Sequence, residues 1–198
     1  MKATPLEVIH TWLTNEVPVC IRRVRVEDEQ RLKDGIALLS HRSRYLRFFT
    51  GMREAPQRVI DALVDVDGHD HIAWGALRSD VVDTPALGVV HAIRDVAEPT
   101  EAEFSVAVID AYHGKGLARL LAAVLLLDCR REGLQHLTVH VLGENAAARA
   151  LAKGLRAQWV GHEMAVQVFD IEVARAIVSL EEEDGLPGLQ PIFEHFRA

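Results

Sequence analysis

The alternation of apolar and polar residues predicts most of the strands in this chain. Residues 19–26 alternate in the way a half-buried strand does. Three apolar segments bounded by Gly, Pro or Asp then follow at short intervals, at residues 72–77, 86–93 and 103–109. We expect them to pair as a meander. Residues 137–142 predict a further strand, and residues 160–171 are expected to be extended.

Helical spacing of apolar residues fills the gaps between these strands. Residues 116–132 predict the longest helix, which is apolar around nearly its whole circumference and is therefore expected to lie buried against a sheet. Shorter helices are predicted at residues 6–15, 27–39, 56–63 and 145–155. Residues 40–51 predict a loop or broken helix, and the tail from residue 172 predicts a helix followed by irregular chain.

Length and composition indicate one folded domain. The chain has 198 residues, 49% of them hydrophobic, and a formal net charge of −7. Its longest strongly apolar run, residues 120–127, is shorter than the roughly 18 residues that a membrane helix needs. With no secretion-signal pattern at the start, we expect a cytoplasmic protein with no membrane partner. The acidic balance argues against nucleic acid as a partner.

The two cysteines carry little functional information. Cys20 and Cys129 are far apart in the sequence and sit in apolar surroundings, which favours buried free thiols in a reducing compartment. A disulfide between them is the alternative.

A glycine-rich segment joins the strand at 103–109 to the long helix. It reads Asp-Ala-Tyr-His-Gly-Lys-Gly-Leu-Ala over residues 110–118. Backbone amides converge in such a loop and the helix dipole adds positive potential, which together make an anion site. Two nucleotide loops are excluded by spacing, because Gly116 follows Lys115 where a P-loop needs Ser or Thr, and Arg119 replaces the third glycine of a dinucleotide fingerprint. A tight turn without a ligand is the alternative.

This loop resembles the pyrophosphate-binding loop of the GNAT superfamily of N-acetyltransferases. The matching pattern is His113-x-x-Gly116-x-Ala118, in which His113 replaces the usual Gln or Arg, and the helix start Asn145-x-x-Ala148 also matches. The resemblance covers residues 19–171. It implies an α/β (α+β) fold with a mixed, mostly antiparallel sheet of about seven strands and helices on both faces.

The resemblance also divides the chain and assigns a co-substrate. It implies an N-terminal helical extension (1–18), an acyl-CoA N-acyltransferase domain (19–171) and a C-terminal helix and tail (172–198). Acetyl-CoA is the expected co-substrate, with no metal. The residues expected to contact it are Val106, Ala107, Val108, His113, Gly114, Lys115, Gly116, Leu117, Ala118, Arg119 and Asn145.

Glu103 is the expected general base, because the bacterial protein lysine acetyltransferase domains that this chain resembles place a glutamate on the same strand. A base is useful since an amine with a pKa of about 10.4 is almost wholly protonated at pH 7. Glu101 lies on the same face as a possible substitute, and a strand end in solvent is the alternative for Glu103. The implied reaction is direct attack in a ternary complex, with backbone amides near residues 106–108 polarising the thioester carbonyl.

The acceptor is expected to be an amine. Residues 39–49 look like the acceptor-side loop of the protein lysine acetyltransferase domains, which favours a protein lysine over a small amine; an aromatic anchor with solvated arginines is the alternative. Ala152 stands where many relatives have a tyrosine that protonates the leaving thiolate. Tyr112 or a water could protonate the thiolate instead, or the thiolate could leave without an acid. Residues 155–157 read Leu-Arg-Ala where the family has Leu-Gly-Phe. These departures give some weight to an alternative to the enzyme, a catalytically silent acyl-CoA-binding regulatory module.

His69 and His71 lie among three aspartates, Asp65, Asp67 and Asp70, which suggests a metal site at first sight. However, Gly68 is in the wrong place for a calcium loop, and the chain has no pair of histidines at helical spacing. We therefore predict a solvent-exposed turn.

Overall fold

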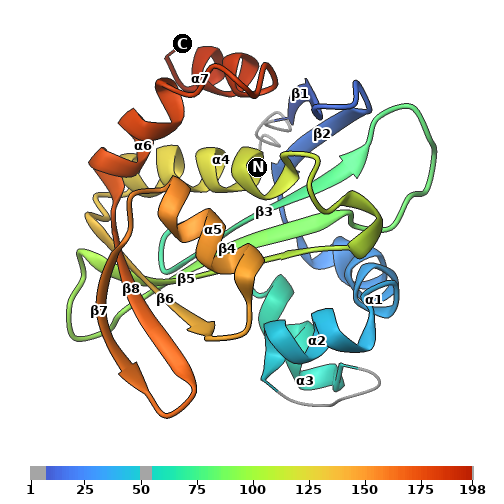
Figure 1. The fold of residues 1–198 in the computed structure, drawn as a ribbon. Helices are drawn as coiled ribbons and strands as arrows, with labels where there is room; N and C mark the ends of the chain where they lie inside the picture. Colours follow the sequence, from blue (N-terminus) through green and yellow to red (C-terminus); the bar gives the residue numbers. More distant parts are fainter. Residues whose placement is uncertain (1–7, 50–54, 198) are drawn as a thin grey trace.

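A computed structural model describes residues 8–49 and 55–197, which fold into one open sheet flanked by helices (Figure 1). The strands are β1 Val8–Trp12, β2 Pro18–Arg23, β3 His71–Arg78, β4 Gly88–Arg94, β5 Glu101–Val108, β6 His136–Leu142, β7 Gln158–Glu163 and β8 Val166–Glu172. Their order is β1-β2-β3-β4-β5-β6-β8-β7, and only the β5–β6 pair is parallel. The predicted mixed, mostly antiparallel fold is confirmed, with eight strands in the described residues instead of about seven.

Helices cover both faces of this sheet, as predicted (Figure 1). On one face lie α1 Glu29–Ala37, α2 His41–Phe48 and α3 Gln57–Val64. On the other lie α4 Leu117–Arg131, α6 Val173–Glu181 and α7 Leu189–Arg197, and α5 Ala146–Gly154 contacts α6. The predicted loop or broken helix thus contains a regular helix, α2, which Ser40 caps by accepting a hydrogen bond from the Ser43 amide. Residues 50 and 51 of the predicted loop lie outside the described residues.

The core follows the alternation along the central strands. Even-numbered residues of β3, such as Trp74, face α4, whereas Ala73 packs with Leu32 of α1 and Val64 of α3 on the opposite face. Helix α4 is buried at every position from 120 to 129, since the sheet covers one side and α6 and α7 cover the other. The prediction of a helix buried all round is confirmed.

The predicted helix at residues 6–15 is wrong for the part that the structure describes. Val8–Trp12 is a strand that pairs antiparallel with β2. The buried positions alternate at Ile9, Thr11 and Leu13, and the β-branched residues Val8, Ile9 and Thr11 fit a pleated surface. Thr11 is buried because its hydroxyl donates a hydrogen bond to the Gly188 carbonyl at 2.6 Å. Residues 6 and 7 lie outside the described residues.

Two further differences lie near the C-terminus. The extended segment at 160–171 is a hairpin, β7 and β8, that turns at Met164, which has a left-handed φ of 51°. The tail after α6 is not irregular throughout, since it ends in a second helix, α7, which packs on β1 and α4. Pro191 stands in the first turn of α7, where a missing amide hydrogen costs little.

Both cysteines are free thiols in the structure. Cys129 is fully buried in α4, and this burial raises the pKa of its thiol. Cys20 is only partly buried, so the prediction of buried thiols is confirmed for Cys129 and too strong for Cys20. No helix among the described residues is long and apolar enough to cross a membrane.

Replacing Gly188 by alanine is expected to lower the free energy of unfolding by about 1–3 kcal/mol. A Cβ at this position would overlap the Trp12 carbonyl oxygen and lie 2.9 Å from Thr11 Oγ1. The matched control is Gly185→Ala, because a Cβ at Gly185 meets nothing within 4 Å. In urea unfolding, the midpoint concentration should be lower than that of the wild-type protein for Gly188→Ala and unchanged for Gly185→Ala. Equal midpoints for the two variants would show that the tail does not pack on β1 as described.

Candidate active site

Two glycines shape the loop between β5 and α4. Gly114 and Gly116 have φ values of 71° and 86°, in the left-handed region that glycine occupies without steric cost. A Cβ at Gly114 would meet nothing within 4 Å, so this glycine faces open space. A Cβ at Gly116 would overlap the side chain of Leu186, so Gly116 allows the C-terminal segment to pack against the loop.

The backbone amides of residues 114–118 have the properties of an anion-binding site. None of them donates a hydrogen bond to another described residue, and no side chain caps α4 at Gly116. Side chains around them are held in place: His113 Nε2 lies 2.7 Å from the Val108 carbonyl oxygen, and Lys115 Nζ donates to the Ala111 carbonyl at 2.5 Å. Arg119 pairs with Glu183 of the C-terminal segment. Unpaired amides at the positive end of a 15-residue helix favour phosphate.

Strands β5 and β6 separate beside this loop. They pair at only three positions, Glu101 with His136, Ala102 with Leu137 and Glu103 with Thr138, although both strands continue beyond them. Residues 106–108 therefore keep their pairing with β4 but have no strand partner on the β6 side. The opening leads from Glu103 toward the amides of the glycine loop.

Glu103 lies at the point where the two strands part. Its side chain is 62% exposed, and its Oε1 is 4.0 Å from Nδ1 of His140 on β6. Glu101 lies two residues away on the same face and is also exposed. A carboxylate that water and substrate both reach suits proton transfer from an amine.

Asn145 caps helix α5. Its Oδ1 accepts a hydrogen bond from the Ala148 amide at 3.0 Å, which explains the Asn-x-x-Ala spacing by local geometry. The side-chain nitrogen of Asn145 donates no hydrogen bond within the described chain and is available to a ligand.

The structure also places the departures from the family pattern. Ala152 is buried and has no group that transfers a proton. The Arg78 guanidinium donates hydrogen bonds to Asp80 and to the hydroxyl oxygen of Tyr112, and both bonds raise its pKa. Arg156 has a left-handed φ of 53°, the conformation that glycine takes without strain. This conformation agrees with the glycine that the resemblance implies at this position.

The helix α2 is tied to the glycine loop. Asp110, at the start of the loop, accepts hydrogen bonds from the Ser40 amide and the Ser43 hydroxyl, both at 2.9 Å. Two of the three arginines of α2 turn inward: Arg44 donates to the Leu39 carbonyl at 2.6 Å, and Arg47 donates to Ser105 Oγ on β5 at 2.9 Å. The alternative of wholly solvated arginines is therefore wrong for these two residues.

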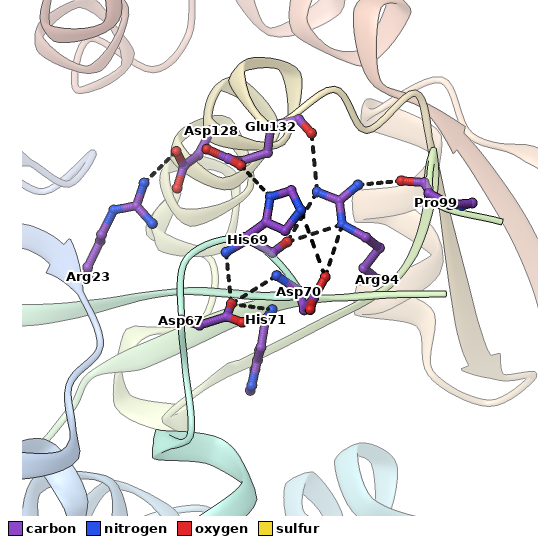
Figure 2. A network of polar contacts seen from close by, with 9 residues as sticks. All are labelled: Arg23, Asp67, His69, Asp70, His71, Arg94, Pro99, Asp128 and Glu132. Carbon is purple, nitrogen blue, oxygen red and sulfur yellow. Dashed lines mark hydrogen bonds and ion pairs between the residues drawn. The ribbon is translucent and has the colours of Figure 1, made fainter. Parts of the chain in front are cut away.

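The turn with His69 and His71 is a structural junction (Figure 2). Asp67 accepts hydrogen bonds from the amides of residues 69–71, and these bonds lower the pKa of its carboxyl. His69 Nδ1 lies 2.8 Å from Oε2 of Glu132, just after α4, and Arg94 donates to the Glu132 carbonyl. No group of three or more His, Cys, Asp or Glu residues in the described parts of the chain is arranged to hold a metal ion.

The chain matches known acetyltransferases. The model of the "Acetyltransferase (GNAT) family" matches residues 37–155. Acetyltransferase Pat of Mycolicibacterium smegmatis is 29% identical over 157 residues, which are 77% of this chain and 45% of that protein. Acetyltransferase PA5475 of Pseudomonas aeruginosa is 30% identical over 137 residues, which are 69% of this chain and 73% of that protein. This chain thus spans less than half the length of Pat.

The structural comparison agrees with these sequence matches. The crystal structure of the GNAT domain of S. lividans PAT has a TM-score of 0.77 at 20% identity, with 84% of this chain and 97% of that domain covered. At this identity the likeness establishes the fold, while the family model and the PA5475 match establish the family. The resemblance seen in the sequence is confirmed, and this chain belongs to the acetyltransferase (GNAT) family.

Proposed function

We propose that this chain is an N-acetyltransferase, an acyltransferase of groups other than amino-acyl groups, that moves the acetyl group of acetyl-CoA to a primary amine with Glu103 as general base. One observation carries the proposal: the gap between β5 and β6 opens at Glu103 and leads to the unpaired amides of residues 114–118. A thioester laid along this gap would have its reacting carbon beside a carboxylate and its phosphates at a helix N-terminus.

In this arrangement the pyrophosphate accepts hydrogen bonds from the amides of Gly114, Lys115, Gly116, Leu117 and Ala118. His113 and Arg119 flank the loop, and the pantetheine arm follows residues 106–108 on the side that β6 leaves unpaired. The Asn145 side-chain nitrogen faces no competing partner among the described residues. These contacts use backbone amides and the side chains of His113, Arg119 and Asn145, and no metal ion takes part in the proposed arrangement.

The chemical step balances without a covalent enzyme intermediate. Glu103 takes a proton from the ammonium, and the freed nitrogen lone pair attacks the thioester carbon while the carbonyl oxygen is held by strand amides. The nitrogen then loses a second proton to water. The C–S bond breaks, its electron pair leaves with the CoA sulfur, and the thiolate takes up a proton from water or Tyr112. Ala152 supplies no acid at this step, so the leaving thiolate depends on its own low basicity.

For the acceptor, the resemblance implies a protein lysine. An exposed Glu103 is compatible with a lysine carried on a large substrate, and it is also open to a small amine. The competing hypothesis is a catalytically silent acyl-CoA-binding regulatory module, which keeps the loop and has no use for Glu103.

A transfer assay separates these hypotheses. The purified chain is incubated with acetyl-CoA and, in turn, a lysine-containing peptide and a set of small amines, and both CoA and acetylated amine are quantified by mass spectrometry. We expect amine-dependent formation of the two products in equal amounts. A folded protein that binds acetyl-CoA and forms no product with any amine would contradict the enzyme and favour the silent module.

A further inference from the structure

A cavity of about 370 Å³ lies between α2, α3 and the sheet face that carries Glu103. Its polar lining consists of Arg47, Arg58, His71, His91 and Ser105, and Phe48, Ile93 and apolar side chains of α3 complete it. Ser105 is two residues from Glu103 on β5, so the two side chains share a face roughly 7 Å apart. The cavity is therefore a neighbour of the candidate base and does not overlap the acetyl-CoA path.

The charge of this cavity is positive in an acidic protein. Two arginines line it, and no Asp or Glu among the described residues does, although the chain carries a formal net charge of −7. Arg47 forms no ion pair with a described carboxylate; its guanidinium donates only to Ser105 Oγ. Burial lowers the pKa of Arg47, against the nearby charge of Glu103. Glu103 acts on Arg47 only from a distance, and a desolvated cation with no carboxylate in direct contact is costly unless a ligand supplies one.

A chain of hydrogen bonds determines which ring nitrogen of His91 carries the hydrogen. His71 Nδ1 lies 2.7 Å from the Asp65 carbonyl oxygen, which only accepts, so Nδ1 carries the hydrogen. In a neutral His71 the other nitrogen, Nε2, then accepts from His91 Nδ1 at 2.9 Å. His91 Nε2 is left as a lone pair, and this buried atom has no hydrogen-bond partner. Burial lowers the pKa of His91, which keeps the ring neutral.

Resting on the proposed function, we propose that this cavity binds the carboxylate and α-amino group of a small diamino acid such as free lysine and holds its terminal amine at Glu103. Arg47 and Arg58 would pair with the carboxylate, and the lone pair of His91 Nε2 would accept from the α-ammonium. The four-carbon side chain of lysine bridges a separation of this order between head group and reacting amine. The terminal ammonium then passes one proton to Glu103, its nitrogen forms the C–N bond as the C–S bond breaks, and the nitrogen loses its second proton to water.

The test compares free lysine with cadaverine, which is lysine without its carboxylate. We expect kcat/KM for lysine to exceed that for cadaverine by about 10- to 100-fold in the wild-type protein. Arg47→Gln should remove this preference by lowering the value for lysine alone, and Arg47→Lys should retain part of it. Arg42→Gln is the matched control on α2, because the Arg42 side chain is 69% exposed and does not line the cavity.

A binding measurement keeps this inference separate from the proposed function. Titration calorimetry with lysine and with cadaverine needs no turnover. Lysine binding that depends on Arg47 without acetylation of any amine would support the cavity and overturn the proposed enzyme. Equal kcat/KM for lysine and cadaverine, or acetylation of a lysine-containing peptide alone with no dependence on Arg47, would overturn the cavity proposal and leave the enzyme standing. Circular dichroism of each variant shows whether it is folded.

Discussion

Glu103→Gln is expected to lower kcat/KM for acetyl transfer by about 100- to 10,000-fold, the range that a positioned general base contributes. An amine with a pKa of about 10.4 is neutral in only about one molecule in 2,500 at pH 7, so loss of the proton acceptor leaves almost no nucleophile. Glutamine keeps the shape of the side chain, which is 62% exposed, so the fold should not change. Initial rates at saturating acetyl-CoA measure the effect.

Two controls make this result specific. Glu101→Gln removes another exposed carboxylate on the same face and is expected to change kcat/KM by less than about threefold, since a surface charge some 7 Å away has only a screened effect. The Kd for acetyl-CoA should stay within about twofold in both variants, because neither residue contacts the phosphates in the proposed arrangement. An equal decrease in kcat/KM in the two variants, or no decrease in Glu103→Gln, would show that Glu103 is not the general base.

Ala118→Asp is expected to abolish acetyl-CoA binding while leaving the protein folded. Ala118 lies in the first turn of α4, where a carboxylate suits the helix dipole and should not reduce stability. The same carboxylate would face the pyrophosphate. At about 5 Å and an effective dielectric constant of about 20, each pair of like charges costs about 3 kcal/mol, which is more than 100-fold in Kd.

Thermal unfolding with and without acetyl-CoA measures this effect. At 100 times the Kd, binding stabilises the wild-type protein by about 2.7 kcal/mol and should raise its Tm by roughly 5–10 °C. Ala118→Asp should show no rise at the same concentration. Ala118→Asn has the same shape without the charge and should keep most of the rise. An undiminished rise in Ala118→Asp would place the phosphates away from this helix.

Local patterns predicted the elements whose burial is regular. The strands β3, β4 and β5 and the helix α4 bury one face or the whole circumference with apolar side chains, so period and composition agree with the final packing. The glycine loop could also be predicted from the sequence, because the turn requires the left-handed φ values that Gly114 and Gly116 take.

Local sequence patterns do not predict the elements that depend on contacts with distant parts of the chain. The strand β1 buries the polar Thr11, and only its hydrogen bond to Gly188, far along the chain, accounts for that burial. The helix α7 follows Pro187 and Gly188 and contains Pro191, which read as breakers until the packing on β1 is known. In both cases tertiary contacts outweigh local preference.

In the candidate site, too, the local sequence predicts some features and tertiary contacts determine the others. Glu103 and the loop residues follow from motif and strand position, whereas the orientation of Arg47 toward Ser105 and the His71–His91 pair depend on how α2 and α3 cross the sheet. The histidines lie 20 positions apart on adjacent strands, and the pairing register that joins them has no local signal.

Titration calorimetry of the wild-type protein with acetyl-CoA at two temperatures tests the central claim most directly. The account predicts saturable binding at one site per chain, with heat detectable at one temperature at least, because a binding enthalpy that vanishes at one temperature does not vanish at another when binding changes the heat capacity. A folded protein that shows no binding of acetyl-CoA at either temperature would contradict the account and leave Gly114 and Gly116 as parts of a structural turn.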